Sequence, residues 1–407
     1  MASRSYAVSA FPDAGRPRTV IPPVKQIPAA DGEPEYLRHY RYDTQLARDA
    51  FVLIAVKNLT QERKNRERLE RLCNHVPRIG SPIARPAEEG IVGSCMLSVD
   101  WLSDGCFSDC IRLNDPIGVD VCEEMVALSS RDRVYLFDAA GDRLETLENP
   151  WFATLHSVVF SSDGDRILVA SSGFDTIFEV SVASGKVLWE WNSWEHGYSV
   201  SVTGKSVFTR GDRRPSLDAA EGREIIHVDP SHFGAAGVPI WHRPAHLNGA
   251  AYDRDGNVLA TLFHPGHAVK IDKKSKTCVE LLSQLNKPHA FLPTENGGYV
   301  VTSTAGENAQ TVFLDDRWRV TQRVSPSGLL GIRDGFPDSE EWMQYTTDLG
   351  EGLSAMVDIH RSSIFIVSPA TRRYRRIGFP RNWAVQMVIR VSGDLRLPPQ
   401  HLLPTLR

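Results

Sequence analysis

The feature that most constrains the fold is the stretch of residues 151–191, which contains four short runs of alternating or β-branched residues. Ser-Asp-Gly, Ser-Gly-Phe-Asp and Ala-Ser-Gly turn signals separate these runs. Runs of this length between such turns predict a four-stranded antiparallel sheet. The four expected strands are residues 156–160, 166–171, 176–180 and 187–191.

The same pattern recurs along the chain with a polar residue at a fixed place. In four stretches, a histidine or asparagine in the first run stands eight residues before a turn glycine. The pairs are His156 with Gly164, His196 with Gly204, His289 with Gly297, and Asn248 with Gly256. His246 lies two residues before Asn248, which on a strand is the same face. Repeats of this kind predict an all-β fold, a six-bladed β-propeller.

The repeats give approximate blade boundaries. The expected blades are residues 115–147, 151–191, 196–227, 246–282, 289–324 and a divergent sixth within 328–378. The terminal run, residues 384–391, is a strand without a hairpin partner and is expected to complete the first blade, which would close the ring. Five or seven blades remain alternatives, because the first hundred residues and the sixth blade have the weakest patterns.

The N-terminal part has a different composition. Residues 1–35 are rich in Pro, Ala and Gly and predict an extended arm. Residues 42–76 have apolar residues at helical spacing, followed by a stretch dense in Arg, Lys and Glu, and predict a helix or helical pair. We therefore expect an arm and N-terminal helical extension over residues 1–89 and the propeller over 90–407. The helical segment is a candidate contact for a homo-oligomer.

Charge and hydropathy indicate which partners and location to expect. The 407 residues carry a formal net charge of -4, which predicts no nucleic-acid or membrane partner. No apolar run approaches the length of a bilayer span, and the first residues lack the apolar core of a secretory signal. These patterns predict a cytoplasmic protein.

The repeated histidines suggest a metal site. Inner strands of a propeller line its axis, so histidines at one register should meet there. We expect His156, His196 and His289 to bind a divalent metal ion, Fe(II) or Zn, with His246 as the fourth ligand or an acid-base group. Asn248 and His264 would complete a catalytic pocket with His246. The alternative interpretation is that these side chains only form hydrogen bonds within the inner strands.

Three stretches resemble the arylsulfotransferase-like and NHL-like group of six-bladed propellers. They are LNGAAYDRDGNVLATLF (residues 247–263), HAVKID (267–272) and SGKVLWEW (184–191). The resemblance covers about residues 115–390. It implies that His246 and Asn248 match the His-x-Asn pair of the arylsulfotransferase active site, in which a histidine carries the sulfuryl group. That family would place an arginine on the next strand, where this chain has His264.

The resemblance also extends to other metal-dependent propellers. A three-histidine site with an open position is similar to that of the zinc lyase of peptide amidation, and four-histidine iron is found in seven-bladed carotenoid oxygenases. We therefore expect a metal-dependent enzyme of lyase, hydrolase or oxygenase type that acts on a small molecule. The alternatives are sulfuryl transfer through a histidine and a non-catalytic interaction propeller.

Overall fold

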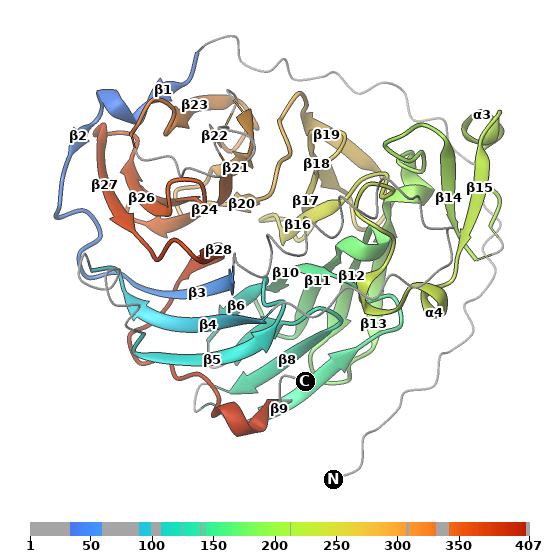
Figure 1. Ribbon diagram of the computed structural model, residues 1–407, viewed down its shortest axis with the longest axis horizontal. Coiled ribbons are helices and arrows are strands. Elements are labelled where there is room, and N and C mark those ends of the chain that lie inside the picture. Colours follow the sequence, from blue (N-terminus) through green and yellow to red (C-terminus); the bar gives the residue numbers. More distant parts are fainter. Residues whose placement is uncertain are drawn as a thin grey trace.

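In a computed structural model of the protein, the described residues are 33–58, 89–98, 107–123, 125–138, 141, 143–211, 213–306, 309–330 and 342–403. They form six antiparallel blades arranged around a central axis (Figure 1). One strand of each blade lies next to the axis, and we call it the inner strand. The inner strands of successive blades contact one another. The predicted six-bladed propeller is confirmed. Among the described residues, no helix combines the length and the apolar composition that crossing a bilayer requires.

Blades I to III each have four strands, in order from the axis outward. Blade I contains β28 (Trp383–Arg390), β3 (Phe51–Asn58), β4 (Glu89–Met96) and β5 (Asp109–Asn114). Blade II contains β6 (Val119–Cys122), β7 (Met125–Ser129), β8 (Arg133–Asp138) and β9 (Arg143–Glu148). Blade III contains β10 (Leu155–Phe160), β11 (Arg166–Ser171), β12 (Thr176–Ser181) and β13 (Val187–Asn192).

The remaining blades follow the same plan. Blade IV contains β16 (Leu247–Tyr252), β17 (Val258–Leu262), β18 (His267–Ile271) and β19 (Cys278–Leu282). Blade V contains β20 (Phe291–Pro293), β21 (Tyr299–Ser303), β22 (Gln310–Leu314) and β23 (Val320–Ser325). Blade VI contains β24 (Met343–Gly350), β25 (Leu353–Asp358), β26 (Ser363–Ser368) and β27 (Arg373–Gly378).

The apolar core lies between the blades. Successive residues of a strand point to opposite faces, so a strand in the middle of a blade can pack against both neighbouring blades. In β11, Ile167 and Val169 join the cluster shared with blade II, whereas Leu168 and Ala170 join the cluster shared with blade IV. This two-sided burial explains why middle strands are almost continuously apolar.

Blade I is built from both ends of the chain. The C-terminal strand β28 pairs antiparallel with β3, and β3 pairs with β4. The terminal strand therefore closes the ring, as predicted, but it completes a blade formed by β3, β4 and β5 and not the blade expected over residues 115–147. The prediction of a helix over residues 42–76 is wrong for residues 51–58, which form β3; residues 59–76 lie outside the described part. The run Phe51–Val56 is apolar throughout because β3 is buried on both faces.

The chain before residue 90 also contributes strands to two other blades. Strand β1 (Glu35–Tyr36) runs parallel to β23 at the outer edge of blade V, and β2 (Arg41–Tyr42) runs parallel to β27 at the outer edge of blade VI. The short 3-10 helix η1 (Leu37–His39) connects them. The propeller thus extends into the stretch that the sequence assigned to an arm and a helical segment.

The expected blade over residues 196–227 does not form. Strands β14 (Ser206–Arg210) and β15 (Glu224–Val228) pair in parallel as a separate two-stranded sheet at the periphery (Figure 1). A parallel pair needs a crossover rather than a hairpin. Here the crossover carries the one-turn helix α3 (Leu217–Ala220), and a second short helix, α4 (Pro230–Phe233), follows β15.

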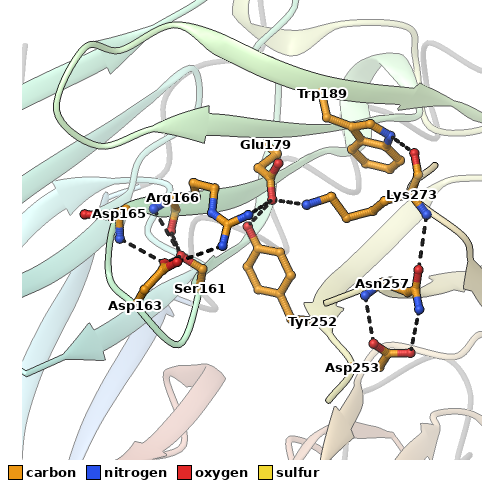
Figure 2. A network of polar contacts seen from close by, with 10 residues as sticks. All are labelled: Ser161, Asp163, Asp165, Arg166, Glu179, Trp189, Tyr252, Asp253, Asn257 and Lys273. Atoms are coloured by element: carbon orange, nitrogen blue, oxygen red, sulfur yellow. Dashed lines mark hydrogen bonds and ion pairs between the residues drawn. The ribbon is translucent and has the colours of Figure 1, made fainter. Parts of the chain in front are cut away.

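A polar network joins blade III to blade IV (Figure 2). Its centre is Glu179 on β12, which is 3% exposed. The carboxylate accepts a hydrogen bond from the Tyr252 hydroxyl at 2.9 Å and forms an ion pair with Lys273. The Lys273 carbonyl accepts a hydrogen bond from Trp189 Nε1 at 2.9 Å. The buried carboxylate therefore links β12 to β16 and to the turn after β18.

Removing this carboxylate is expected to destabilise the fold. Glu179→Ala leaves Lys273 and Tyr252 without their partner in a mostly buried place, so we expect the free energy of unfolding to fall by about 3 kcal/mol. Chemical denaturation measures this loss. A matched control is Glu148→Ala, because Glu148 pairs with Arg133 at 2.9 Å but its side chain is 61% exposed; its effect should stay below about 1 kcal/mol. Equal effects of the two substitutions would contradict this role of Glu179.

Candidate functional site at one end of the propeller axis

Four of the predicted site histidines come from the same end of the inner strands. His156 is on β10, His246 directly precedes β16, and His289 lies two residues before β20. His264 follows β17, and because β17 runs antiparallel to β16, the end of β17 lies beside the start of β16. We call His156, His246, His264 and His289 the axial histidines.

The rings of this group form a continuous series of contacts with two aromatic side chains. The His246 ring centroid lies 5.4 Å from that of His156 and 5.5 Å from that of His264. Phe263 is 4.8 Å from His246 and 5.5 Å from His289. Trp342, just before β24, continues the series at 6.2 Å from His289. The series therefore spans blades III to VI.

The backbone at His246 is fixed by a buried carboxylate. His246 has φ of 49°, in the left-handed region that non-glycine residues rarely adopt. The fully buried Asp175 accepts hydrogen bonds from the amides on either side, Ala245 N at 3.0 Å and Leu247 N at 3.1 Å. It also accepts one from Trp194 Nε1 at 3.2 Å. Asp175 therefore holds His246 in a conformation that the chain would not otherwise favour.

The partner of His246 determines where its proton lies. Arg243 Nη1 is 3.2 Å from His246 Nδ1, and a guanidinium only donates. Nδ1 is therefore the acceptor, and the neutral ring carries its proton on Nε2. Burial, and then the positive charge of Arg243, hold the pKa of His246 well below its usual value. His246 is thus a neutral hydrogen-bond donor.

His289 has the opposite arrangement. Its Nδ1 is 3.1 Å from the Lys287 carbonyl, which only accepts, and 2.6 Å from Thr304 Oγ1. Nδ1 therefore carries the proton and Nε2 keeps its lone pair. Burial lowers the pKa of His289 to about 4. His289 is thus neutral near pH 7 and can accept a proton at Nε2.

His264 has a nitrogen lone pair that is available as an acceptor, as His289 does. His264 Nε2 donates to the Ile240 carbonyl at 3.0 Å, which leaves Nδ1 as an acceptor. Burial lowers the pKa of His264, the Ile240 carbonyl raises it, and the charges of Arg243 and Lys287 lower it further. His264 therefore lies within the electrostatic influence of both cations.

Arg243 uses all five of its N–H groups within the protein. Besides His246, its acceptors are Val238 O, Ala236 O, Thr154 Oγ1 and Ser172 Oγ, at 2.6 to 3.4 Å. Arg243 therefore acts through His246 and through its charge, not by direct donation to a ligand. Arg243 was not predicted from the sequence, because the family resemblance implies an arginine on the next strand. The signal was nearer, since Arg243 lies three residues before His246 in the same stretch.

Asn248 supports the group from the inner strand. Its Nδ2 donates to Pro288 O at 3.3 Å, which links blade IV to the residue before His289. Its Oδ1 is buried and has no hydrogen-bond partner among the described residues. Asn248 thus lies beside the axial histidines, as the sequence analysis expected, and it positions His289.

His196 does not join this group. It ends the 3-10 helix η3 (Ser193–His196), and its ring stacks on Trp191 with centroids 5.2 Å apart and planes 11° apart. Burial, and then the charge of Lys276, lower its pKa to about 4. The prediction that His196 lies on an inner strand, made from its eight-residue offset, is wrong. The strand expected after His196 is reduced to one isolated β-bridge, between Val200 and Val207.

The residues do not fit the predicted metal centre. Among the described residues, no group of three or more His, Cys, Asp or Glu side chains is placed to hold a metal ion. With His196 elsewhere, the four predicted ligands do not converge. The nearest charges to the axial histidines also disfavour a cation, because Arg243 contacts His246 and Lys287 lies beside His289.

No protein-family model matches the chain, and no curated protein does. Solved structures do match. A protein of unknown function from Bacteroides caccae is similar at 12% identity over 84% of this chain and 99% of that chain, with a TM-score of 0.50. Virginiamycin B lyase from Staphylococcus aureus is similar at 13% identity, over 65% and 70% of the chains, with a TM-score of 0.40. A chain of a nidogen/laminin complex is similar at 11% identity, over 83% and 97%, with a TM-score of 0.47. At 12% identity and a TM-score of 0.50, the first of these likenesses concerns the fold alone.

Proposed function

We propose that this propeller is an enzyme that catalyses proton transfer next to a carbonyl group of a small molecule. The observation that carries the proposal is the opposite placement of protons on His246 and His289. The His246 ring has an N–H at Nε2, because Arg243 can only donate to its Nδ1. The His289 ring has a lone pair at Nε2, because the Lys287 carbonyl can only accept from its Nδ1. Enolisation requires a hydrogen-bond donor and a base near each other, and these two side chains lie at the same end of the propeller axis, both in contact with Phe263.

The step balances without an added reagent. His289 Nε2 takes a proton from the carbon next to the carbonyl and becomes an imidazolium. The electron pair of the C–H bond forms the enolate, whose oxygen accepts a hydrogen bond from His246 Nε2. Transfer of the proton from His289 to another carbon of a conjugated enolate is an isomerisation, and departure of a group from the β carbon, with the proton of His289 passing to that group, is an elimination. The elimination is a reaction of the lyase type, one of the three reaction types that the sequence led us to expect.

The surrounding charges support an enolate. Arg243 and Lys287 place two positive charges near the group, and a developing oxyanion is stabilised by fixed positive charge in a site of low polarity. Because the pKa of His246 is held well below its usual value, it stays neutral and can share its proton without losing it.

The same proton placement ranks proton transfer ahead of sulfuryl transfer. A histidine that carries a sulfuryl group needs a lone pair on the attacking nitrogen. In His246, Arg243 occupies the lone pair of Nδ1, and Nε2 holds the proton. Incubation with an aryl sulfate and a phenol acceptor tests this alternative directly; transfer above background would favour it.

The test is exchange of substrate hydrogen with solvent. We expect the protein in D2O to accelerate deuterium incorporation next to the carbonyl of at least one member of a panel of keto acids and keto esters, followed by proton NMR. His246→Gln should slow this exchange, whereas His401→Gln, at an exposed histidine outside the axial group, should not. Activity should survive treatment with a chelator. No exchange across the panel, or loss of exchange on chelation, would contradict the proposal.

A further inference from the structure

Lys287 occupies a distinct place beside the axial histidines. It lies in the connection between blades IV and V, two residues before His289, with φ of 53°. Its carbonyl accepts the Nδ1 proton of His289, and its ammonium lies 5.4 Å from the centroid of the Trp342 ring. The backbone that fixes the base therefore also positions a cation next to it.

No carboxylate among the described residues forms an ion pair with Lys287. Other half-buried lysines of the propeller do have such partners: Lys270 pairs with Asp253 at 2.5 Å, and Lys273 pairs with Glu179. The contact that Lys287 makes is with an aromatic face, which attracts a cation but leaves its N–H groups available. A half-buried ammonium in this state is suited to meet an anionic ligand.

Arg243 cannot supply this contact. All five of its N–H groups donate to acceptors within the protein. An anionic group of a ligand would therefore feel the positive charge of Arg243 without receiving a hydrogen bond from it. The Lys287 ammonium lies on Trp342, and the His289 and Phe263 rings separate that indole from His246. A ligand that reaches both His246 and Lys287 therefore extends along these rings.

We infer that Lys287 and Trp342 form a subsite for the carboxylate of the substrate, whose carbonyl group lies against His246. This inference rests on the proposed function and narrows the substrate class to keto acids, or to esters and amides that carry a separate carboxylate. Between the two polar groups, the substrate has an apolar portion that packs on Phe263 and His289.

The experiment compares a charged and a neutral ligand that share one keto-acid skeleton, 4-oxopentanoate and its methyl ester. Isothermal titration calorimetry should show that Lys287→Met weakens binding of the acid by about tenfold or more and leaves binding of the ester unchanged. Lys287→Arg should retain most of the affinity for the acid. Met and Arg carry the same backbone cost as Lys at this φ, and thermal unfolding of each variant checks that the fold is retained.

The outcomes separate this inference from the proposed function. If the wild-type protein does not prefer the acid to the ester, or if Lys287→Met weakens both equally, the subsite is refuted. Exchange of neutral keto esters that continues in that case leaves the proposed function standing. Conversely, charge-dependent binding of the acid in a protein that shows no exchange supports the subsite and contradicts the chemistry.

Discussion

Replacing His289 with glutamine is expected to lower the rate of solvent exchange by about 10²- to 10⁴-fold, the usual contribution of a positioned general base. Glutamine keeps a polar group of similar size beside Thr304 and Lys287 but has no lone pair basic enough to take a proton from carbon. The affinity for 4-oxopentanoate should change little, because Lys287 and His246 remain. Exchange rates by NMR and dissociation constants by calorimetry measure the two effects separately.

The neighbouring histidine provides the matched control. His264→Gln removes another imidazole of the group and should have a smaller effect, since His264 Nε2 is hydrogen-bonded to the Ile240 carbonyl and we do not assign His264 the role of the base. If His264→Gln abolished exchange and His289→Gln did not, the assignment of the base would be wrong. In the wild-type protein, the rate should also fall as the pH drops through about 4, where His289 becomes protonated.

The same His289→Gln substitution is expected to make the fold more resistant to acid. Burial lowers the pKa of His289 from 6.5 to about 4 in the folded protein. Between these two values the unfolded chain binds a proton that the folded chain does not, so the stability is fully present above pH 6.5 and is lost as the pH falls towards 4. For this one residue the loss is about 3 kcal/mol.

The quantity to measure is the difference in the free energy of unfolding between the His289→Gln variant and the wild type, because this difference contains the titration of His289 alone. Burial also lowers the pKa of His196, and it raises that of Asp120 to about 7, which changes stability with pH in the opposite direction. These effects are common to both proteins and cancel. The free energy of unfolding of the variant minus that of the wild type, measured by urea denaturation, should rise by about 3 kcal/mol from pH 7 to pH 4. A difference that is independent of pH would contradict the neutral state of buried His289.

The propeller could be predicted because its blades repeat a local pattern. The runs and turns over residues 151–191 form β10 to β13, and the stretch from His246 forms blade IV. The strand β3 was missed because a continuous apolar run fits a buried strand as well as a helix. Its inner partner, β28, lies at the other end of the sequence, where no local signal connects the two.

The site was predicted only where it follows the repeat. His156 and His289 share an offset and an end of the axis, and His246 follows from alignment of its blade. Arg243, Lys287 and Trp342 come from the connections between blades, which have no common length or pattern. The residues from His196 to His227 are predicted to form a blade because His196 and Gly204 stand eight residues apart, as in the true repeats. Only the pairing of β14 with β15 exposes the coincidence.

The composition of blade I makes completion of the ring wait for the synthesis of residues 383–390. Strand β3 is synthesised before blades II to VI, whereas its inner neighbour β28 is synthesised after them. Until β28 has been synthesised, one edge of the apolar strand β3 is unpaired. The nascent chain must therefore be protected from aggregation during this time. A chain truncated shortly before residue 383 would contain all strands of blades II to VI but would leave β3 without its inner neighbour.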